Sequence, residues 1–144
     1  MEKYFECKVK YEKINDKGME KVVTENYLVE AVSFTDAEAT IIKKLEPYIT
    51  GEFVVVSIKR AIYGELAISE DGEIFFKAKI SFSSIDEESG YVKKSTSYIL
   101  VKADNSKEAL TRIDELMKDV FSEYELPAVS ETTIIDVFLT NTNK

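Results

Sequence analysis

The sequence predicts an α+β protein: a tandem duplicated β-β-α-β unit, with a mainly antiparallel sheet and two helices packed on one face. Two observations lead to this prediction. Apolar residues alternate with polar ones along several segments and recur every three or four residues along two others, which are the patterns of strands and helices. The pattern of residues 1–71 also returns in residues 72–139. We favour a single six-stranded sheet, and two small sheets joined along an edge are the main alternative.

The repeat is clearest in the first strand expected in each half. Its apolar residues are matched 71 positions later, Phe5, Cys7, Val9 and Tyr11 by Phe76, Ala78, Ile80 and Phe82. The offset becomes 72 from the second strand onward, and Val56-Ser57 matches Val129-Ser130 at an offset of 73. We therefore predict a single domain over 1–144, made of the repeats 1–71 and 72–139, with a polar tail at 140–144 that frays.

The first two strands of each repeat are expected to form a hairpin. In residues 5–11 apolar and charged side chains alternate, which is typical of a strand with one buried and one solvated face. Asn15-Asp16-Lys17-Gly18 then supplies residues that tolerate the backbone angles of a tight turn. The alternation resumes at Tyr27, Val29 and Ala31, so the second strand returns beside the first.

One helix follows in each repeat. Thr35-Asp36-Ala37-Glu38 and Asn105-Ser106-Lys107-Glu108 have the order of a capping box, in which side chains accept hydrogen bonds from free amide groups at the helix start. Apolar residues three or four apart then give each helix one apolar stripe. The stripes are Ala37, Ile41, Leu45 and Tyr48, and Ala109, Ile113, Leu116, Met117 and Val120. Pro47 predicts that the first helix ends within a turn of it.

A third strand closes each repeat. Residues 53–58 and 132–138 are rich in β-branched and aromatic side chains and too short for a typical helix. Between the two halves, Asp71-Gly72 is flanked by apolar residues, which predicts a hairpin that joins the repeats. The order of the strands within the sheet does not follow from the pattern.

The composition excludes several classes of function. The chain has no histidine, which removes His-based acid–base catalysis and nearly all protein-ligated zinc sites. Its net charge of −8 argues against broad adhesion to nucleic acid or to an anionic membrane. No segment has the pattern of a signal peptide or a membrane span, and the single cysteine agrees with a reducing compartment. We therefore expect a cytoplasmic protein that is not an enzyme and uses no cofactor or metal.

Two features that suggest chemistry have simpler interpretations. Cys7 lies on the apolar side of its strand, where its repeat equivalent is Ala78, so we expect a buried and unreactive thiol. Asp86-Glu87-Glu88 lacks the residue order of a calcium loop and occupies the position of the Asn15-Asp16 turn. We expect this acidic run to be a solvated turn.

The candidate binding residues are four lysines on the solvated side of the first strand of each repeat: Lys8, Lys10, Lys77 and Lys79. If these two strands are adjacent in space, the lysines form a symmetric positive patch that suits a phosphate-bearing ligand or a nucleic-acid backbone. The alternative is that they only solvate the open face of a sheet.

Several segments carry a resemblance to a known family. They are residues 5–13, 24–39, 47–53, 58–61 and 128–132. Over nearly the whole chain, the sequence resembles domain of unknown function family 4494, a family of small proteins from gut anaerobic bacteria and their phages or mobile elements. The resemblance implies no catalytic residue, cofactor or partner, and its phage association suggests an accessory role.

From these observations we expect a non-enzymatic binding or protein-interaction module, with self-association as a homodimer as one form of it. The chain is duplicated, lacks a catalytic constellation, and β-rich units with open strand edges readily add another strand or subunit. The alternative is a nucleotide- or nucleic-acid-binding protein that uses the four lysines. An enzyme that uses carboxylate or Tyr/Lys chemistry at a subunit boundary is the third hypothesis.

Overall fold

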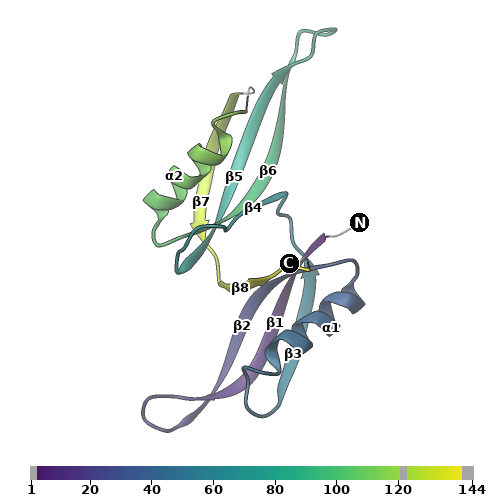
Figure 1. The fold of residues 1–144 in the computed structure, drawn as a ribbon. Coiled ribbons are helices and arrows are strands. Elements are labelled where there is room, and N and C mark those ends of the chain that lie inside the picture. Colours follow the sequence, from purple (N-terminus) through teal and green to yellow (C-terminus); the bar gives the residue numbers. More distant parts are fainter. Residues whose placement is uncertain (1–2, 121–122, 141–144) are drawn as a thin grey trace. The chain divides into compact units, whose positions relative to one another are not determined.

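The computed structural model describes residues 3–120 and 123–140, and within them it has two helices and eight strands (Figure 1). The first half of the chain contains β1 (Lys3–Ile14), β2 (Glu20–Ala31), α1 (Phe34–Leu45), β3 (Phe53–Arg60) and β4 (Glu65–Ala67). The second half contains β5 (Ile74–Ile85), β6 (Val92–Ala103), α2 (Ser106–Met117), β7 (Glu123–Glu131) and β8 (Ile134–Phe138). The α+β class predicted from the sequence is confirmed.

The described strands form two separate sheets, each in its own compact unit. Unit 1 holds the described residues up to Ala61 and from Thr133 onward, and unit 2 holds Ile62–Thr132. The strand order is β3-β1-β2-β8 in unit 1 and β7-β5-β6-β4 in unit 2, so the two sheets have the same topology. The expected single six-stranded sheet is therefore wrong. The two first strands cannot join one sheet, because β1 and β5 each have both edges occupied by strands of their own unit.

Each sheet takes one outer strand from the other half of the chain. β4 follows β3 in the chain but pairs in parallel with β6, while β8 follows β7 but pairs in parallel with β2 (Figure 1). The unit boundaries consequently lie at 61/62 and 132/133, ten residues before the repeat boundary at 71/72 in the first case. This exchange of strands links the two halves through the topology of the chain.

The exchange overturns two local predictions. The hairpin expected at Asp71-Gly72 is wrong, because β6 and β7 occupy both edges of β5 and β4 pairs elsewhere. The third strand of the second repeat was expected at residues 132–138, and this is also wrong, because that strand is β7. Most of 132–138 is β8, which lies in the sheet of unit 1.

The main cluster of buried residues in each unit lies between its helix and its sheet, and Leu28 and Leu100 are also fully buried on the opposite face of β2 and β6. In unit 1 the core consists of Phe5, Cys7, Val9, Tyr27, Val29, Ala31, Ala37, Ile41 and Leu45. In unit 2 it consists of Phe76, Ala78, Ile80, Ile99, Val101, Ala103, Ala109, Ile113 and Met117. Each residue of the first core corresponds to one of the second at an offset of 71 or 72. The strand and helix periods of the sequence thus select the buried residues, whereas a duplication as the origin stays a prediction.

Both helices begin with a side-chain cap, but only one cap is the predicted residue. In α2, Oδ1 of Asn105 accepts a hydrogen bond of 2.8 Å from the backbone N–H of Glu108, as predicted. In α1 the cap is Ser33, whose Oγ accepts a hydrogen bond of 3.1 Å from the backbone N–H of Asp36. The prediction of Thr35 as the cap is therefore wrong, because α1 begins at Phe34. Ser33 corresponds to Asn105 at the repeat offset of 72.

Both helices end before the last residue of their predicted apolar stripe, and part of the predicted tail lies outside the described residues. α1 ends at Leu45, close to Pro47 as predicted, and α2 ends at Met117. Tyr48 and Val120, which were expected on the apolar stripes, lie past these ends and are 81% and 40% exposed. At the end of the chain, the backbone N–H of Thr140 donates a hydrogen bond of 3.1 Å to Glu30. Residues 141–144 of the tail expected to fray lie outside the described residues.

Candidate functional site

The four candidate lysines lie as two separate pairs. A single patch required β1 and β5 to be adjacent, and these strands belong to different sheets. Lys8 and Lys10 are exposed and alternate with the core residues of β1, so they lie on the face of the sheet opposite α1. Asn26 and Thr24 on β2 are their ladder partners. The structure therefore brings Lys8 and Lys10 together on an open surface.

The second lysine pair is less accessible. Lys77 and Lys79 occupy the equivalent positions of β5, and both are half-buried. Nζ of Lys77 lies 5.2 Å from the centroid of the Tyr98 ring, which is a cation–π contact. The ammonium group of Lys77 is thus already engaged in a contact within the protein.

Cys7 is buried, as predicted, and its surroundings suppress its reactivity. The side chain is 0% exposed and lies in the core of unit 1. Burial, together with the nearby charge of Glu6, raises the pKa of the Cys7 thiol to about 12. The nucleophilic thiolate is therefore absent at neutral pH.

The acidic run at residues 86–88 forms a turn. Oδ1 of Asp86 accepts a hydrogen bond of 2.9 Å from the backbone N–H of Glu88, and the N–H of Ser89 also donates to it. These backbone donors lower the pKa of Asp86, and Nζ of Lys93 lies 3.6 Å from its other carboxylate oxygen. The carboxylate of Asp86 thus stabilises the turn between β5 and β6.

A polar cluster of Tyr11, Glu25 and Tyr27 lies on the helix side of the sheet of unit 1. The hydroxyls of Tyr11 and Tyr27 both donate to Oε1 of Glu25, over 2.8 Å and 3.0 Å. Burial, followed by the hydrogen bond and charge of Glu25, raises the pKa of Tyr11 to about 12, and burial and the same carboxylate raise the pKa of Tyr27. Both hydroxyls stay protonated at neutral pH, so this cluster favours a structural role over acid–base catalysis.

Within residues 3–120 and 123–140, no group of three or more Cys, Asp and Glu side chains is arranged so that it could hold a metal ion. In the same part of the chain, neither helix has the length and apolar character needed to cross a membrane.

β3 presents an open and apolar strand edge. It is the outermost strand of its sheet and pairs only with β1 among the described strands. The backbone groups on its other side therefore have no strand partner there. Val54 and Val56 on β3 are 62% and 52% exposed. Such an edge is a template for the addition of another strand.

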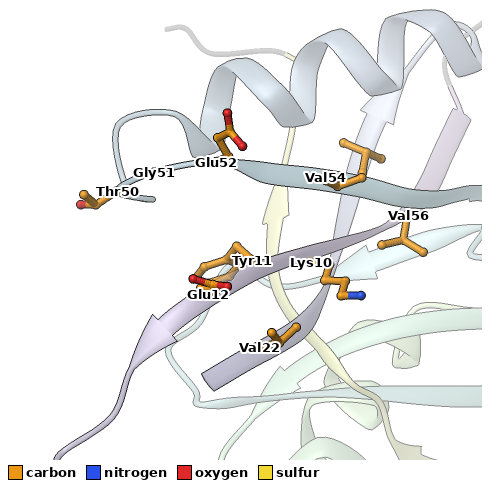
Figure 2. A pocket seen from close by; sticks show the side chains of 10 residues that line it. Lys10, Tyr11, Glu12, Val22, Thr50, Gly51, Glu52, Val54 and Val56 are labelled. Carbon is orange, nitrogen blue, oxygen red and sulfur yellow. The ribbon is translucent and has the colours of Figure 1, made fainter. Parts of the chain in front are cut away.

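Two grooves flank this edge. The first, which we call the sheet groove, has a volume of about 770 Å³ (Figure 2). It is lined by Lys10, Tyr11, Glu12, Val22, Thr50, Gly51, Glu52, Val54, Val55 and Val56. The second, the helix groove, has a volume of about 680 Å³ and lies between α1 and β3. It is lined by Glu38, Ile42, Glu46, Ile49, Gly51, Glu52, Phe53, Val54 and Val55. A strand added beside β3 would direct successive side chains alternately toward the two grooves.

The third strands of the two repeats match in a register that differs from the expected one. Ile58 on β3 faces Cys7, and Val129 on β7 faces Ala78, the equivalent of Cys7. β3 and β7 therefore match at an offset of 71. The expected offset of 73, which matched Val56-Ser57 with Val129-Ser130, is wrong. Since the helices match at an offset of 72 and these strands at an offset of 71, the second repeat has one residue fewer between equivalent positions of its helix and this strand.

At the correct offset, the outer edge of β7 is protected where that of β3 is open. Glu125 takes the place of Val54, and Pro127 takes the place of Val56. A charge on an edge strand discourages further pairing, and a proline has no N–H to donate. The same topological position is thus blocked in unit 2 and left open in unit 1.

Sequence reasoning found β3 but missed its place at an edge, and so it missed Val54 and Val56 as candidate site residues. Strand order depends on contacts between distant segments, which a local pattern does not contain. One signal was present: Pro127 within a strand favours an edge position. Because Pro127 corresponds to Val56 at the offset of 71, an edge position for β7 would also have predicted an edge position for β3.

Comparison with known proteins identifies the family. No curated protein and no solved structure matches the chain. The family model described as domain of unknown function (DUF4494) matches residues 3–140, a range that includes every described helix and strand. The family resemblance expected from the sequence is confirmed, while an origin in gut bacteria or their phages stays a prediction. The chain, whose two four-stranded units each take one strand from the other half of the sequence, therefore belongs to the DUF4494 family of domains of unknown function.

Proposed function

We propose that this chain is a non-enzymatic protein-interaction module that binds an extended segment of its partner along the free edge of β3. The observation that carries the proposal is the contrast between β3 and β7. Both are outer strands at the same place in their sheets, yet only β7 has a glutamate and a proline, Glu125 and Pro127, where β3 has two valines. An exposed apolar edge is a hazard that natural proteins usually block. Its retention in one unit favours a use for it.

The grooves beside β3 indicate what such a partner would contain. Main-chain hydrogen bonds along the edge would supply affinity, and alternate side chains in the two grooves would supply specificity. The sheet groove combines the apolar residues Val22, Val54 and Val56 with one base, Lys10, and two acids, Glu12 and Glu52. The helix groove adds the carboxylates of Glu38 and Glu46. A fitting segment would place apolar side chains toward the first groove and a basic one toward the second.

A peptide selection tests this function. Random extended peptides displayed on phage are selected on the wild-type protein, and the affinities of the selected peptides are then measured for two variants. Val54→Glu copies Glu125 of β7 and should weaken binding at least about tenfold. Val92→Glu is the control, because Val92 is 61% exposed and lies on β6 in the other unit. Equal affinities for both variants, or a selection that yields no binder, would contradict the proposal.

Binding of a nucleotide or nucleic acid is a second candidate function, supported by the exposed pair Lys8 and Lys10. The candidate residues are Lys8, Lys10, Lys77 and Lys79. Glu6 and Glu12 flank the pair on the same face of β1 and oppose a phosphate ligand. A labelled single-stranded oligonucleotide at low salt is the probe. This function requires binding that weakens with salt and with Lys8→Ala/Lys10→Ala. No binding at low salt, or binding unchanged when all four lysines are replaced, would exclude it.

A further inference from the structure

We infer that the partner of the β3 edge is β3 of a second copy of this chain, paired antiparallel about a two-fold axis. This inference rests on the proposed function, because it uses the same edge, and it names the partner. β3 and the residue before it run from acidic Glu52 through apolar Val54-Val55-Val56 to basic Lys59-Arg60. In an antiparallel pair of identical strands, the start of each lies beside the end of the other. Acidic residues then face basic ones, whereas a parallel pair would place like charges together.

A bulge in β3 determines which register this pair can adopt. Lys8 faces Ser57 and Val9 faces Val55, so Val56 is an extra residue in β3. Side chains alternate between the two faces of a sheet, and one extra residue reverses the alternation beyond it. Before the bulge, even-numbered residues lie on the face opposite α1, and after the bulge odd-numbered residues do.

Only pairs of residues from the same face can lie opposite each other in a continuous sheet. On the face opposite α1, β3 and its flanking residue present Glu52 and Val54 before the bulge, and Ser57 and Lys59 after it. Pairing Glu52 with Lys59 and Val54 with Ser57 of the second copy satisfies this condition. Pairing Glu52 with Arg60 does not, because Arg60 faces Phe5 and lies on the helix side.

Charge distinguishes this register from the next one that keeps the faces matched. A shift by two residues places Val54 opposite Lys59 and leaves Glu52 without an opposite charge. The guanidinium of Arg60 already lies 5.6 Å and 5.2 Å from the ring centroids of Phe5 and Phe34 in its own copy. Lys59 is exposed and makes no such ring contact with the described residues, and its ladder partner on β1 is the acidic Glu6. Glu52 opposite Lys59 is therefore the register that the sequence of β3 favours.

β7 lacks this self-complementarity, although it occupies the equivalent position. Glutamates lie at both of its ends and near its centre, at Glu123, Glu125 and Glu131. In the equivalent register, an antiparallel pair of β7 strands would place Glu123 opposite Ser130 and Glu125 opposite Ala128, so neither glutamate would face a basic residue. Pro127 would also remove a donor from the ladder. The chain therefore has two equivalent outer strands, of which only β3 is suited to pair with itself. Such pairing would join two four-stranded sheets into one of eight strands.

Charge reversal on β3 tests the inference without altering the core. The wild-type protein should have about twice the 16.4 kDa mass of the chain in light scattering. Glu52→Lys and Lys59→Glu should each weaken dimerisation at least about tenfold, since each creates two like-charge contacts per dimer. The double variant Glu52→Lys/Lys59→Glu exchanges the two charges and should restore the affinity of the wild type. Val56→Pro copies Pro127, which β7 accommodates, and should give a folded monomer.

Matched variants of β7 are the controls, and each outcome has a distinct meaning. Glu123→Lys and Ser130→Glu make the equivalent charge changes on the other outer strand and should leave the dimer unchanged. A wild-type monomer would overturn the inference, and selected peptides that still bind at β3 would leave the proposed function standing. A dimer that ignores the β3 variants uses another surface and would also overturn the inference. Failure of the double variant to restore dimerisation would exclude the register of Glu52 with Lys59.

Discussion

The hydroxyl of Tyr11 donates a hydrogen bond of 2.8 Å to Oε1 of Glu25, and so links β1 to β2 across their ladder. The hydroxyl of Tyr27 donates to the same oxygen over 3.0 Å. The Tyr27 side chain is buried and stacks on Phe138 of β8, with the ring centroids 5.7 Å apart. The carboxylate oxygen of Glu25 thus connects β1 to β2, and the Tyr27 ring connects β2 to β8.

Replacement of Glu25 should therefore destabilise unit 1. Glu25→Ala leaves two partly buried hydroxyls without their acceptor, and we expect the free energy of unfolding to fall by about 1–3 kcal/mol. Glu25→Gln retains an acceptor oxygen and should cost less. Urea denaturation measures both, with Glu20→Ala as a control for loss of an exposed carboxylate on β2. Equal losses for Glu25→Ala and Glu20→Ala would show that the shared hydrogen bonds contribute nothing.

Stability should decrease at alkaline pH. The pKa values of Cys7 and Tyr11 are raised to about 12 in the folded protein, and that of Tyr27 is also raised. In the unfolded chain these groups titrate near about 8.5 for Cys and about 10 for Tyr. Between those values and about 12, the folded state binds more protons than the unfolded state. The stabilising contribution of these groups to the free energy of unfolding should therefore be fully present below about pH 8.5. It should be lost as the pH rises toward about 12.

Urea midpoints measured across this pH range test the expectation. Cys7→Ala should remove the part of the decrease that begins near about pH 8.5, and Glu25→Ala should reduce the part that begins near about pH 10. Midpoints that stay constant from neutral to strongly alkaline pH would contradict the raised pKa values.

The parts of the fold that sequence predicts well depend on local periodicity. The alternation around Cys7 and the three-to-four spacing around Ile41 and Ile113 directly select buried residues, so the hairpins, helices and cores are predicted. The exchange of β4 and β8 depends on pairing between distant segments. The three residues of β4 are too few to show a period, and Asp71-Gly72 has the local signal of a hairpin that the competing strands β6 and β7 prevent.

The candidate site was less predictable than the fold, again for a physical reason. The lysines were found because an exposed charged side chain is visible in the alternation of β1. Whether two such strands lie side by side is a matter of sheet order, and β1 and β5 belong to different sheets. Val54 and Val56 resemble core residues in sequence, and only their position on an outer strand makes them exposed.

The corrected helix cap gives a direct comparison of two neighbouring residues. Ser33→Ala removes the oxygen that accepts from the N–H of Asp36, and it should lower the free energy of unfolding by about 0.5–2 kcal/mol. Thr35→Ala alters an exposed residue inside α1 and should change it by less than about 0.5 kcal/mol. Thermal or urea denaturation measures the difference. A larger loss for Thr35→Ala would restore Thr35 as the cap.

Gly72 is expected to tolerate no side chain, for a reason other than its backbone angles. A Cβ added at this residue would lie 2.6 Å from both the backbone N and the Cα of Ala103 on β6. Gly72→Ala must therefore displace the backbone, and we expect a loss of about 1–3 kcal/mol in the free energy of unfolding. Ser69→Ala, in the same connection between β4 and β5, is the control. Equal stability of the two variants would mean that the connection moves aside without cost.

The last prediction concerns the strand that unit 1 receives from the end of the chain. The rings of Phe138 and Tyr27 are stacked, with an angle of 18° between their planes. Phe138→Ala should weaken the attachment of β8 to β2 and destabilise unit 1 by about 1–3 kcal/mol.

Residue-resolved hydrogen exchange separates this effect from general destabilisation. If β8 belongs to unit 1, Phe138→Ala should speed exchange of the amides in β1 and β2 and leave those in β5 and β6 nearly unchanged. Leu139→Ala, at a residue that is 39% exposed and follows β8, is the matched control and should alter neither unit. Faster exchange in β5 and β6 alone would mean that β8 pairs within its own repeat, and the exchange of strands between the two halves would then be wrong.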